Sequence, residues 1–339
     1  MNPRPEDFLD LQPTDLSLDA IETPTPVIDL DVVERNVARL QAWCDRLGLA
    51  NRPHIKTHKS AGLARYQIAM GAVGVSVQTL GEADVMAAHG VDDLLLPYNV
   101  IGAAKLDRLA ALMRRTKIAV VADDAAILQG LSYAAREGGR SLRVFVECDT
   151  GAGRNGVQAP AGAVDLARKI AATEGLAFAG LMTYPKAGGR RESGAFLSAA
   201  KASCESAGLA VETITTGGSP DQGRDEGLEV VTEYRAGTSI YYDRAHVARG
   251  AATPADCALT VHATIVSRPT PTRAIMDAGT KSLTSDLLGL DGYGEVVGAR
   301  IRVLPNHVCP VSNLFDRVYV ARGQRLLGTL AIDARGRVA

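Results

Sequence analysis

The feature that most constrains the fold is a regular alternation of apolar runs with amphipathic segments, which begins near residue 25. The segment after Asp31 has helical spacing, because Val33, Val37, Leu40 and Trp43 fall on one face. The apolar runs are continuous, as expected for parallel strands that are covered on both faces. About eight strand–helix units in about 220 residues favour a closed (β/α)₈ TIM barrel over an open doubly wound sheet. The runs that predict strands are residues 25–30, 51–56, 73–78, 93–97, 117–122, 142–149, 176–184 and 211–218, with residues 229–235 leading to a last short segment.

The pattern changes after His246. Short runs of β-forming residues, separated by Gly and Pro, replace the strand–helix units, and this predicts an all-β domain. These runs are residues 259–266, 273–277, 294–297, 300–304 and 317–321. We therefore predict an α/β protein with a TIM barrel over residues 24–246 and a C-terminal all-β domain that includes residues 247–339.

Composition excludes several classes of protein. The 339 residues include 37 Lys and Arg and 38 Asp and Glu, so the formal net charge is −1 and a broad nucleic-acid surface is not expected. No apolar run approaches the roughly 20 residues of a membrane span, and the first residues do not resemble a signal peptide. The five cysteines are scattered and odd in number, which predicts reduced thiols and a cytoplasmic location.

A lysine flanked by two histidines follows the second predicted strand. Lys56 lies at the end of this apolar run, between His54 and His58. Reactive groups of a parallel barrel sit at the C-terminal ends of its strands, and a desolvated lysine there can form a Schiff base. The alternative, that Lys56 and Lys59 are solvated side chains of a basic loop, stays open from composition alone.

Two glycine-rich segments also come directly after strands. In the first, three glycines surround Arg154, which suits close approach of the backbone to an anion or a cofactor oxygen. In the second, Thr216, Gly217 and Gly218 form a loop whose backbone N–H groups could face a phosphate. A turn that needs positive φ angles explains the first segment equally well, and a Gly-Gly pair by itself is a weak signal.

A histidine and a cysteine near the C-terminus are two residues apart. On an extended segment, His307 and Cys309 would project to the same side. Imidazole and thiolate together are suited to Zn²⁺, and two protein ligands leave room for water or substrate. A buried cysteine beside a hydrogen-bonded histidine is the alternative.

Taken together, the lysine, the arginine and the phosphate-type loop describe a pyridoxal-phosphate site. In this order the motifs resemble the alanine-racemase-like (fold type III) pyridoxal-phosphate enzymes, and more closely the D-threonine aldolase and D-serine dehydratase group. The resemblance extends over about residues 20 to 339 and implies that residues 1–23 join the C-terminal β domain. It implies Lys56 as the Schiff-base lysine, with His54 and His58 as further proton-handling candidates, although His58 could instead be a supporting residue. It implies a cofactor site of Lys56, Gln78, Arg154, Tyr184, Thr216, Gly217, Gly218 and Tyr241, and a metal site of His307 and Cys309.

The resemblance also implies the reaction. The leading interpretation is a lyase that cleaves D-3-hydroxy-amino acids to glycine and an aldehyde, with pyridoxal phosphate and a divalent ion, Zn²⁺ or Mn²⁺, acting on the β-hydroxyl. A D-serine or D-threo-3-hydroxyaspartate dehydratase is the alternative, because some aldolases of the group carry an acidic metal ligand where this chain and the dehydratases have cysteine (Cys309). Some aldolases also carry a histidine shortly after the tyrosine that matches Tyr184, and this chain has none there. A racemase or a non-catalytic cofactor binder would not need the metal pair. The group also implies a homodimer that acts on a small D-amino acid and binds neither nucleic acid nor membrane.

Overall fold

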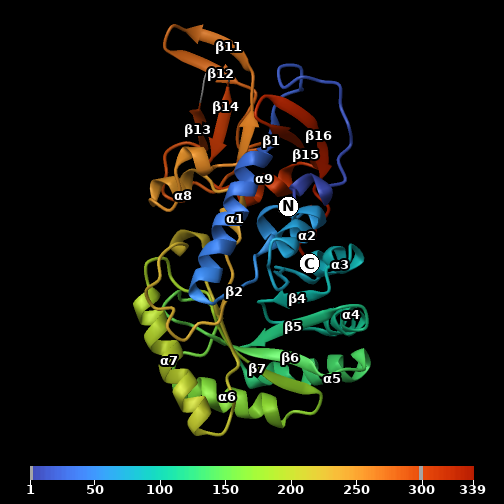
Figure 1. The fold of residues 1–339 in the computed structure, drawn as a ribbon, viewed down its shortest axis with the longest axis vertical. Helices are drawn as coiled ribbons and strands as arrows, with labels where there is room; N and C mark the ends of the chain where they lie inside the picture. Colours follow the sequence, from blue (N-terminus) through green and yellow to red (C-terminus); the bar gives the residue numbers. More distant parts are fainter. Residues whose placement is uncertain (1–2, 298–300) are drawn as a thin grey trace. The chain divides into compact units, whose positions relative to one another are not determined.

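The computed structural model describes residues 3–297 and 301–339. It divides into two compact units (Figure 1). The sheet unit comprises Met1–Leu40, Lys56–Met70 and Gly237–Gly336, and the barrel unit comprises Gln41–Ile55, Gly71–Ala236 and Arg337–Ala339. The domain boundaries at residues 24 and 246 stay a prediction, and the two compact units differ from the predicted domains in residues 24–40, 56–70, 237–246 and 337–339.

The barrel unit is built on an eight-stranded parallel sheet in the order β2-β9-β8-β7-β6-β5-β4-β3. Its two edges also meet, because His54 and Ser76 form a parallel bridge and Ser76 N donates to Pro53 O at 2.8 Å. This closes the predicted (β/α)₈ barrel. The strands are β2 (Ala50–Asn51), β3 (Val75–Ser76), β4 (Asp93–Leu96), β5 (Lys117–Ala122), β6 (Leu142–Cys148), β7 (Leu176–Thr183), β8 (Thr213–Thr216) and β9 (Glu233–Tyr234). The helices are α3 (Leu80–Ala88), α4 (Ala103–Met113), α5 (Leu128–Gly138), α6 (Pro160–Ala172) and α7 (Arg190–Ser206).

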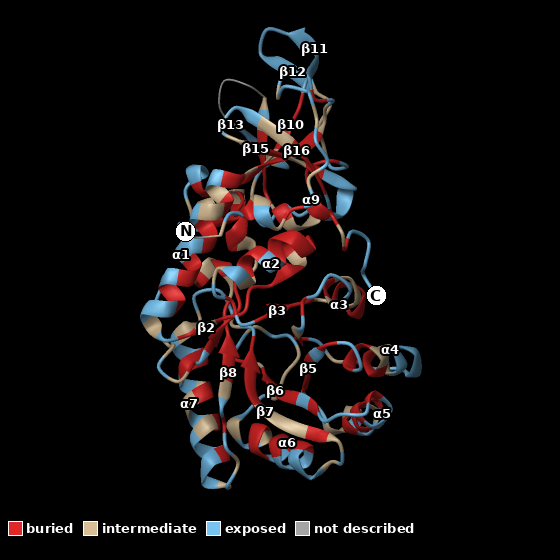
Figure 2. Ribbon diagram, turned by 45° about the vertical axis from the view of Figure 1, so that its right-hand side comes forward, coloured by how far each residue is buried: buried red, intermediate tan, exposed pale blue. Residues whose placement is uncertain are grey.

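The apolar strands supply the barrel core. Most residues of β3 to β6 are buried (Figure 2), and inward side chains from neighbouring strands form one cluster. Because the strands are parallel, their C-terminal ends share one edge, and the loops that leave this edge carry the predicted functional residues. The members of the cluster are Leu95, Ala119, Val121, Phe145 and Met182.

The sheet unit contains a six-stranded, mostly antiparallel sheet in the order β13-β14-β10-β1-β15-β16. One face of it packs on helices, through side chains such as Ile28, Val261 and Val320 against Val37 and Leu63. The strands are β1 (Thr25–Asp29), β10 (Leu259–His262), β13 (Gly294–Val297), β14 (Arg302–Pro305), β15 (Arg317–Arg322) and β16 (Arg325–Ala331), with a separate hairpin of β11 (Ile265–Thr270) and β12 (Arg273–Met276). The helices are α1 (Leu30–Leu47, up to Leu40), α2 (Ala61–Ala69), α8 (Arg244–Ala248) and α9 (Val308–Leu314).

Three expectations about elements need correction. The run 25–30 does form strand β1, but β1 pairs with β10 and β15 in the six-stranded sheet, and the eighth barrel strand is β9. A short apolar run indicates a buried strand without indicating which sheet it joins. The predicted strand 300–304 begins at a residue outside the described ones, and β14 begins at Arg302. The segment of His307 and Cys309 was expected to be extended, whereas α9 begins between these two residues.

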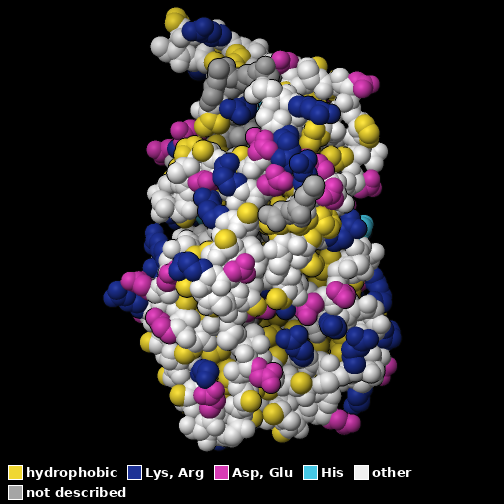
Figure 3. Space-filling model, viewed as in Figure 1, with side chains coloured by type: hydrophobic (Ala, Val, Ile, Leu, Met, Phe, Trp, Pro, Cys, Tyr) yellow, Lys and Arg dark blue, Asp and Glu magenta, His cyan; other side chains and the backbone are white. Residues whose placement is uncertain are grey.

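Charges of both signs are interspersed on the face of the molecule in Figure 3, in keeping with the net charge of −1. Over residues 3–297 and 301–339, no helix combines the length and the apolarity that crossing a bilayer requires.

Candidate functional site

Four of the predicted cofactor contacts lie at the C-terminal edge of the barrel. Gln78 follows β3, Arg154 lies in the loop after β6, Tyr184 follows β7, and Thr216 is the last residue of β8. The edge is the one at which barrel enzymes carry their reactive groups. The structure therefore brings together residues that are up to 138 positions apart in the sequence.

Arg154 and Tyr184 are in direct contact. The guanidinium carbon of Arg154 lies 4.7 Å from the centroid of the Tyr184 ring, which is a cation–π distance, and both side chains are exposed. The loop of Arg154 is closed at its base, where Val157 N donates to Glu147 O. Gly156 has a φ of +130°, and a Cβ there would lie 2.3 Å from Asp149 N. The glycines are thus required by the turn, and the same turn presents Arg154 at the barrel edge.

The Thr216–Gly218 loop has the features of an anion cradle. Thr216 Oγ1 is buried and has no hydrogen-bond partner among the residues that the structure describes. Gly217 has a φ of +121°, and a Cβ there would lie 2.8 Å from the Tyr234 ring, whose hydroxyl donates to Gly218 O. A buried hydroxyl without a partner is costly, and a bound phosphate oxygen would satisfy it. These residues fit a phosphate group.

Gln78 and Arg154 border one continuous hollow. Gln78 lines a pocket of about 320 Å³, and Arg154 lines a second of about 520 Å³. The two pockets share Tyr98, Asn99 and Lys105. The hollow at the predicted cofactor edge is therefore lined by polar and cationic side chains together with apolar ones such as Leu96 and Ile101.

Sequence reasoning missed a buried pair of charges beneath this edge, Glu147 and Arg235. Glu147 Oε2 accepts from Asn155 Nδ2 at 2.7 Å, and Arg235 Nη2 donates to Thr183 O at 2.6 Å. Asn155 is next to Arg154 in the chain, and Thr183 is next to Tyr184, so the pair anchors both loops. A charged residue inside the apolar strand 142–149 was the available signal for Glu147.

Burial raises the pKa of Glu147 to about 7, against the lowering effects of Arg235, Arg154 and the Asn155 hydrogen bond. The ordinary pKa of a glutamate is 4.5. Between about pH 4.5 and pH 7, Glu147 is therefore protonated in the folded protein and ionised in the unfolded chain. The free energy of unfolding therefore falls as pH rises from about 4.5 to about 7, by about 3 kcal/mol at 1.36 kcal/mol per unit.

We expect Glu147→Gln to remove this fall in the free energy of unfolding with rising pH. Urea unfolding at pH 5 and pH 8 should show the variant gaining about 2–3 kcal/mol relative to the wild type at the higher pH. Glu192→Gln, at an exposed position, is the control and should follow the wild type. An unchanged pH dependence in Glu147→Gln would contradict the assignment.

Lys56 lies beside the predicted metal pair within the sheet unit. It belongs to the short 3₁₀ helix Ile55–Thr57 and is half-buried. Thr57 Oγ1 is 3.2 Å from Cys309 Sγ, and Ser312 Oγ donates to Thr57 O at 2.6 Å, so α9 is fastened to this helix. The amine predicted to hold the cofactor is therefore a neighbour of Cys309.

His307 and Cys309 interact as an acid–base pair. Burial would raise the pKa of the Cys309 thiol, but the hydrogen bond and charge of His307, together with Lys56 and Thr57, lower it. Burial would likewise lower the pKa of His307, but Cys309 and Asp286 raise it to about 9. His307 Nδ1 donates to Asp286 Oδ2 at 2.7 Å, which orients the ring toward the thiol.

This pair fits a divalent ion in its donor chemistry. Imidazole and thiolate suit Zn²⁺, and a carboxylate bonded to the second ring nitrogen is the usual support of a metal-binding histidine. Among residues 3–297 and 301–339, no three His, Cys, Asp or Glu side chains form a metal-binding group, and this pair offers two donors. The remaining positions would be open to water or substrate.

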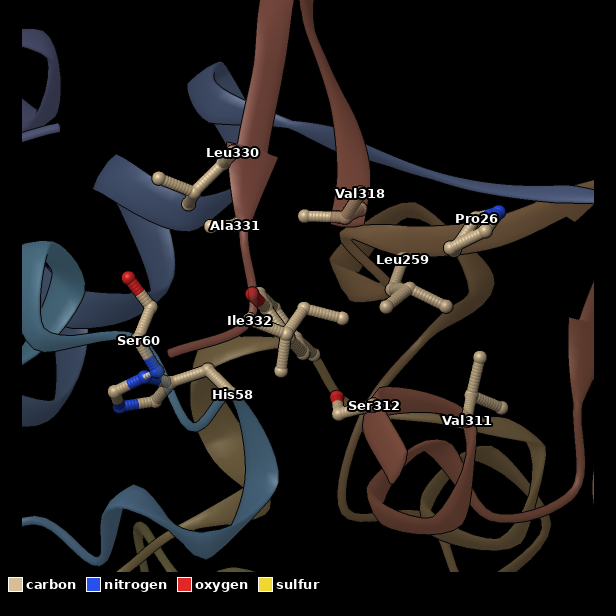
Figure 4. Close-up of a pocket in the computed structure, with 11 residues that line it drawn as sticks. Pro26, His58, Ser60, Leu259, Val311, Ser312, Val318, Leu330, Ala331 and Ile332 are labelled. Carbon is tan, nitrogen blue, oxygen red and sulfur yellow. Dashed lines mark hydrogen bonds between the residues drawn. The ribbon is translucent and has the colours of Figure 1, made fainter. Parts of the chain in front are cut away.

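His58 and Tyr241 line a small internal cavity of the sheet unit, about 10 Å³ (Figure 4). Burial lowers the pKa of His58 to about 4, so its ring is neutral near pH 7. Its Nδ1 accepts from Ser60 N and its Nε2 donates to Gln67 Oε1, at 3.1 and 3.2 Å. Both ring nitrogens are occupied, which favours the supporting role of His58 over proton transfer.

The remaining predicted residues lie in structural positions. Tyr241 is buried in the apolar core of the sheet unit, and burial raises the pKa of its hydroxyl. This placement supports a packing role and gives no support to its predicted phosphate contact. His54 is buried where the two edges of the barrel sheet meet, and its backbone N–H donates to Ala236 O at 2.9 Å.

Comparison with protein families agrees with this geometry. The family model of the alanine racemase N-terminal domain matches residues 28–245, and that of the serine dehydratase domain matches residues 258–299 and 294–321. A D-threonine aldolase of Arthrobacter sp. is 34% identical over 96% of this chain and 95% of its own. A D-threo-3-hydroxyaspartate dehydratase of Delftia sp. is 32% identical over 89% of this chain and 84% of its own.

Solved structures extend the comparison. A D-threonine aldolase of Filomicrobium marinum superposes with a TM-score of 0.88 at 29% identity, covering 97% of this chain and all of the other. The structures of the D-threo-3-hydroxyaspartate dehydratase include variants with a histidine or a cysteine replaced by alanine, at positions two apart. The cysteine variant is in a metal-free form; its TM-score is 0.84 at 26% identity, over 94% of this chain and 99% of the other.

The barrel, the second domain and both sets of matches lead to one conclusion. The chain belongs to the alanine-racemase-like, fold type III family of pyridoxal-phosphate enzymes, in the group whose barrel is followed by a serine-dehydratase-type domain.

Proposed function

We propose that the protein is a lyase of the D-threonine aldolase type, which cleaves D-3-hydroxy-amino acids to glycine and an aldehyde with pyridoxal phosphate and a divalent ion. The observation that carries the proposal is the proximity of Lys56 to Cys309, with His307 completing the pair. An amine for the cofactor beside a metal pair suits chemistry at the carbon that bears the β-hydroxyl. The aldolases among the relatives support the same reaction.

The residues that would hold the cofactor come from the loops that follow β6, β7 and β8 and from the short helix Ile55–Thr57. Thr216, Gly217 and Gly218 would bind its phosphate, Arg154 and Tyr184 its ring region, and Lys56 would hold it covalently. When bound, pyridoxal phosphate withdraws electrons from the substrate's Cα and so labilises its bonds. Glu147 and Arg235 would act beneath the edge, by keeping Arg154 and Tyr184 in place.

His307 and Cys309 would hold the divalent ion. A metal there supplies a Lewis acid for the β-hydroxyl, and Asp286 keeps the His307 ring oriented. Thiolate favours Zn²⁺, and Mn²⁺ also fits a site with open positions. The metal-free form of the dehydratase cysteine variant supports this use of a histidine and a cysteine two residues apart.

Proton transfer falls to Lys56 in this proposal. Its amine would take or return a proton at the substrate's Cα. His58 is neutral and has both ring nitrogens in hydrogen bonds, so it supports this segment instead.

A dehydratase acting on D-serine or D-threo-3-hydroxyaspartate is the second candidate. One specific observation favours it: the family resemblance gives dehydratases a cysteine at the position of Cys309, where some aldolases carry an acidic metal ligand, and the relatives include a D-threo-3-hydroxyaspartate dehydratase. The same residues would serve, with the metal assisting loss of the β-hydroxyl.

One assay separates the two candidates. The protein loaded with pyridoxal phosphate and Mn²⁺ or Zn²⁺ is incubated separately with D-threonine and D-serine. We expect glycine and acetaldehyde from D-threonine, and no product from L-threonine. Ammonia with a 2-oxo acid would establish the dehydratase, and racemised substrate without either product would contradict a lyase.

Arg154→Ala is expected to leave the covalent attachment of the cofactor intact while weakening its affinity about 10- to 100-fold, because a charge-assisted contact worth roughly 1.5–3 kcal/mol is lost. Cofactor dissociation can be followed by dialysis and visible absorbance. Arg191→Ala, which removes an exposed arginine of α7, is the matched control. Wild-type affinity in Arg154→Ala would leave this loop with only its structural role.

Assembly and location are also proposals. A homodimer is supported by exposed apolar side chains of the sheet unit, such as Val266, Val296 and Leu287. Light scattering should give twice the chain mass. A cytoplasmic location is supported by the five scattered cysteines, all of which are free thiols.

A further inference from the structure

We propose that Asp243 is the positioning residue of the His307–Cys309 pair, and that His246 serves to orient Asp243. The proposal rests on the metal site of the proposed function. It concerns the residues that hold the side chains of His307 and Cys309 close to each other. All of the residues involved belong to the sheet unit.

Asp243 joins two elements with one carboxylate. It is fully buried, and its Oδ1 accepts from His246 N at 3.1 Å, which caps helix α8. Its Oδ2 accepts from Val308 N at 3.1 Å. Val308 is the residue between His307 and Cys309, so the carboxylate fixes the peptide that links the two metal ligands.

Neighbouring residues repeat this connection. Ala245 N donates to Asn306 O at 3.2 Å, and Arg244 Nη1 donates to Asn306 Oδ1 at 3.0 Å. The chain from Asn306 to Val308 is thus fastened to the start of α8 at consecutive positions. Asp243 is also among the groups that raise the pKa of His307, so it lies close enough to act on that ring.

Among the described residues, the ring of His246 has one polar contact, and that contact is Asp243. Its Nδ1 donates to Asp243 Oδ1 at 2.6 Å. Its Nε2 is buried and, among the residues that the structure describes, has no hydrogen-bond partner. A buried nitrogen without a partner costs free energy. The hydrogen bond from the same ring to Asp243, which fixes the carboxylate, offsets this cost. A simple helix cap would need only one oxygen of Asp243 and no histidine ring.

The expected consequence is a change in metal affinity. Residues that orient the ligands of a metal commonly change its affinity by about 10- to 100-fold. In Asp243→Asn the amide can accept at only one atom, so either Val308 N–H or the His246 donors lose their acceptor. The ligand side chains would then no longer be held together before the metal binds.

The experiment is a Co²⁺ titration of the cofactor-loaded protein, read by the thiolate-to-cobalt absorption and by equilibrium dialysis. We expect the dissociation constant of Asp243→Asn to rise about 10- to 100-fold, with an altered cobalt spectrum and unchanged cofactor absorbance. Asp243→Glu should restore part of the affinity. Asp256→Asn is the matched control, because Asp256 is also a buried carboxylate at the start of a helical turn, where it accepts from the N-cap Thr253 N at 2.8 Å.

If circular dichroism shows that Asp243→Asn is not folded, a second variant still tests the proposal. Val308→Pro removes the N–H that Asp243 accepts and keeps an apolar side chain at this buried position. Val308 is the first residue of α9, where proline is favoured, and His307 has φ −138° and ψ 111°, which suit a residue before proline. We expect the same loss of affinity.

The outcomes separate this inference from the proposed function. Wild-type Co²⁺ affinity and spectrum in a folded Asp243→Asn or Val308→Pro protein would overturn the role of Asp243 and leave the lyase proposal in place. An equal loss in Asp256→Asn would also overturn it, by showing a general effect of destabilisation. A wild-type protein that binds no Co²⁺ would contradict the metal site itself, independently of any activity measurement.

Discussion

Replacing Lys56 by alanine is expected to abolish both the visible absorption of the covalently held cofactor and the lyase activity. Lys56 is the amine that lies beside the metal pair, and the proposal gives it both the covalent attachment and the proton transfer at Cα. Loss of the proton-transfer role alone costs about 10²- to 10⁴-fold in rate. Absorbance of the purified protein and a product assay with D-threonine measure the two effects separately.

Lys59→Ala is the control for this experiment. Lys59 lies three residues further along and is buried, and its carbonyl accepts from Ala334 N at 3.0 Å, so it is part of the packing of the sheet unit. We expect Lys59→Ala to retain the cofactor absorbance, provided that circular dichroism shows it to be folded. The reverse result, with absorbance lost in Lys59→Ala and kept in Lys56→Ala, would refute the assignment of the lysine.

Removing the metal is expected to have the second large effect. A chelator should lower activity at least about 100-fold while the cofactor absorbance persists, because a Lewis acid at the β-hydroxyl contributes several kcal/mol to the transition state. Added Zn²⁺ or Mn²⁺ should restore activity. The double variant His307→Ala with Cys309→Ala should behave as the chelated enzyme does, and metal should not rescue it.

Cys204→Ala is the matched control, since Cys204 is a buried cysteine of α7 that no proposed step uses. It should keep its response to chelator and metal. Full turnover of a D-3-hydroxy-amino acid by the double variant would rule out the metal mechanism and favour a reaction that does not need the β-hydroxyl.

The barrel could be predicted from the sequence because its signals are local. Each parallel strand is a continuous apolar run, and each helix repeats its apolar side chains with helical spacing. The order of elements also places Arg154, Tyr184 and Thr216 at strand ends, and the structure confirms that these ends share one edge. The apolar residues of strand β1 fit either sheet, so the sequence pattern places this strand in the barrel. Its pairing with β10 and β15 shows that it belongs to the six-stranded sheet.

The parts of the site that escaped prediction depend on contacts between distant residues. Arg235 reaches Thr183 across 52 positions, and Glu147 holds the Arg154 loop through its hydrogen bond with Asn155. Tyr241 matched a motif, but its side chain turns into the core, which sequence spacing does not determine. The link from Cys309 to Thr57 spans 252 positions, so the neighbourhood of Lys56 and the metal pair emerged only with the fold.

The proposal of aldol cleavage can be tested most directly with D-threonine carrying deuterium at Cα. The loaded protein is incubated with this substrate, and the products are analysed by mass spectrometry. Cleavage between Cα and Cβ leaves the Cα–deuterium bond intact, so the account predicts acetaldehyde together with glycine that retains the deuterium. Ammonia and 2-oxobutanoate without that deuterium would contradict it, because they require loss of the α-hydrogen and of the β-hydroxyl.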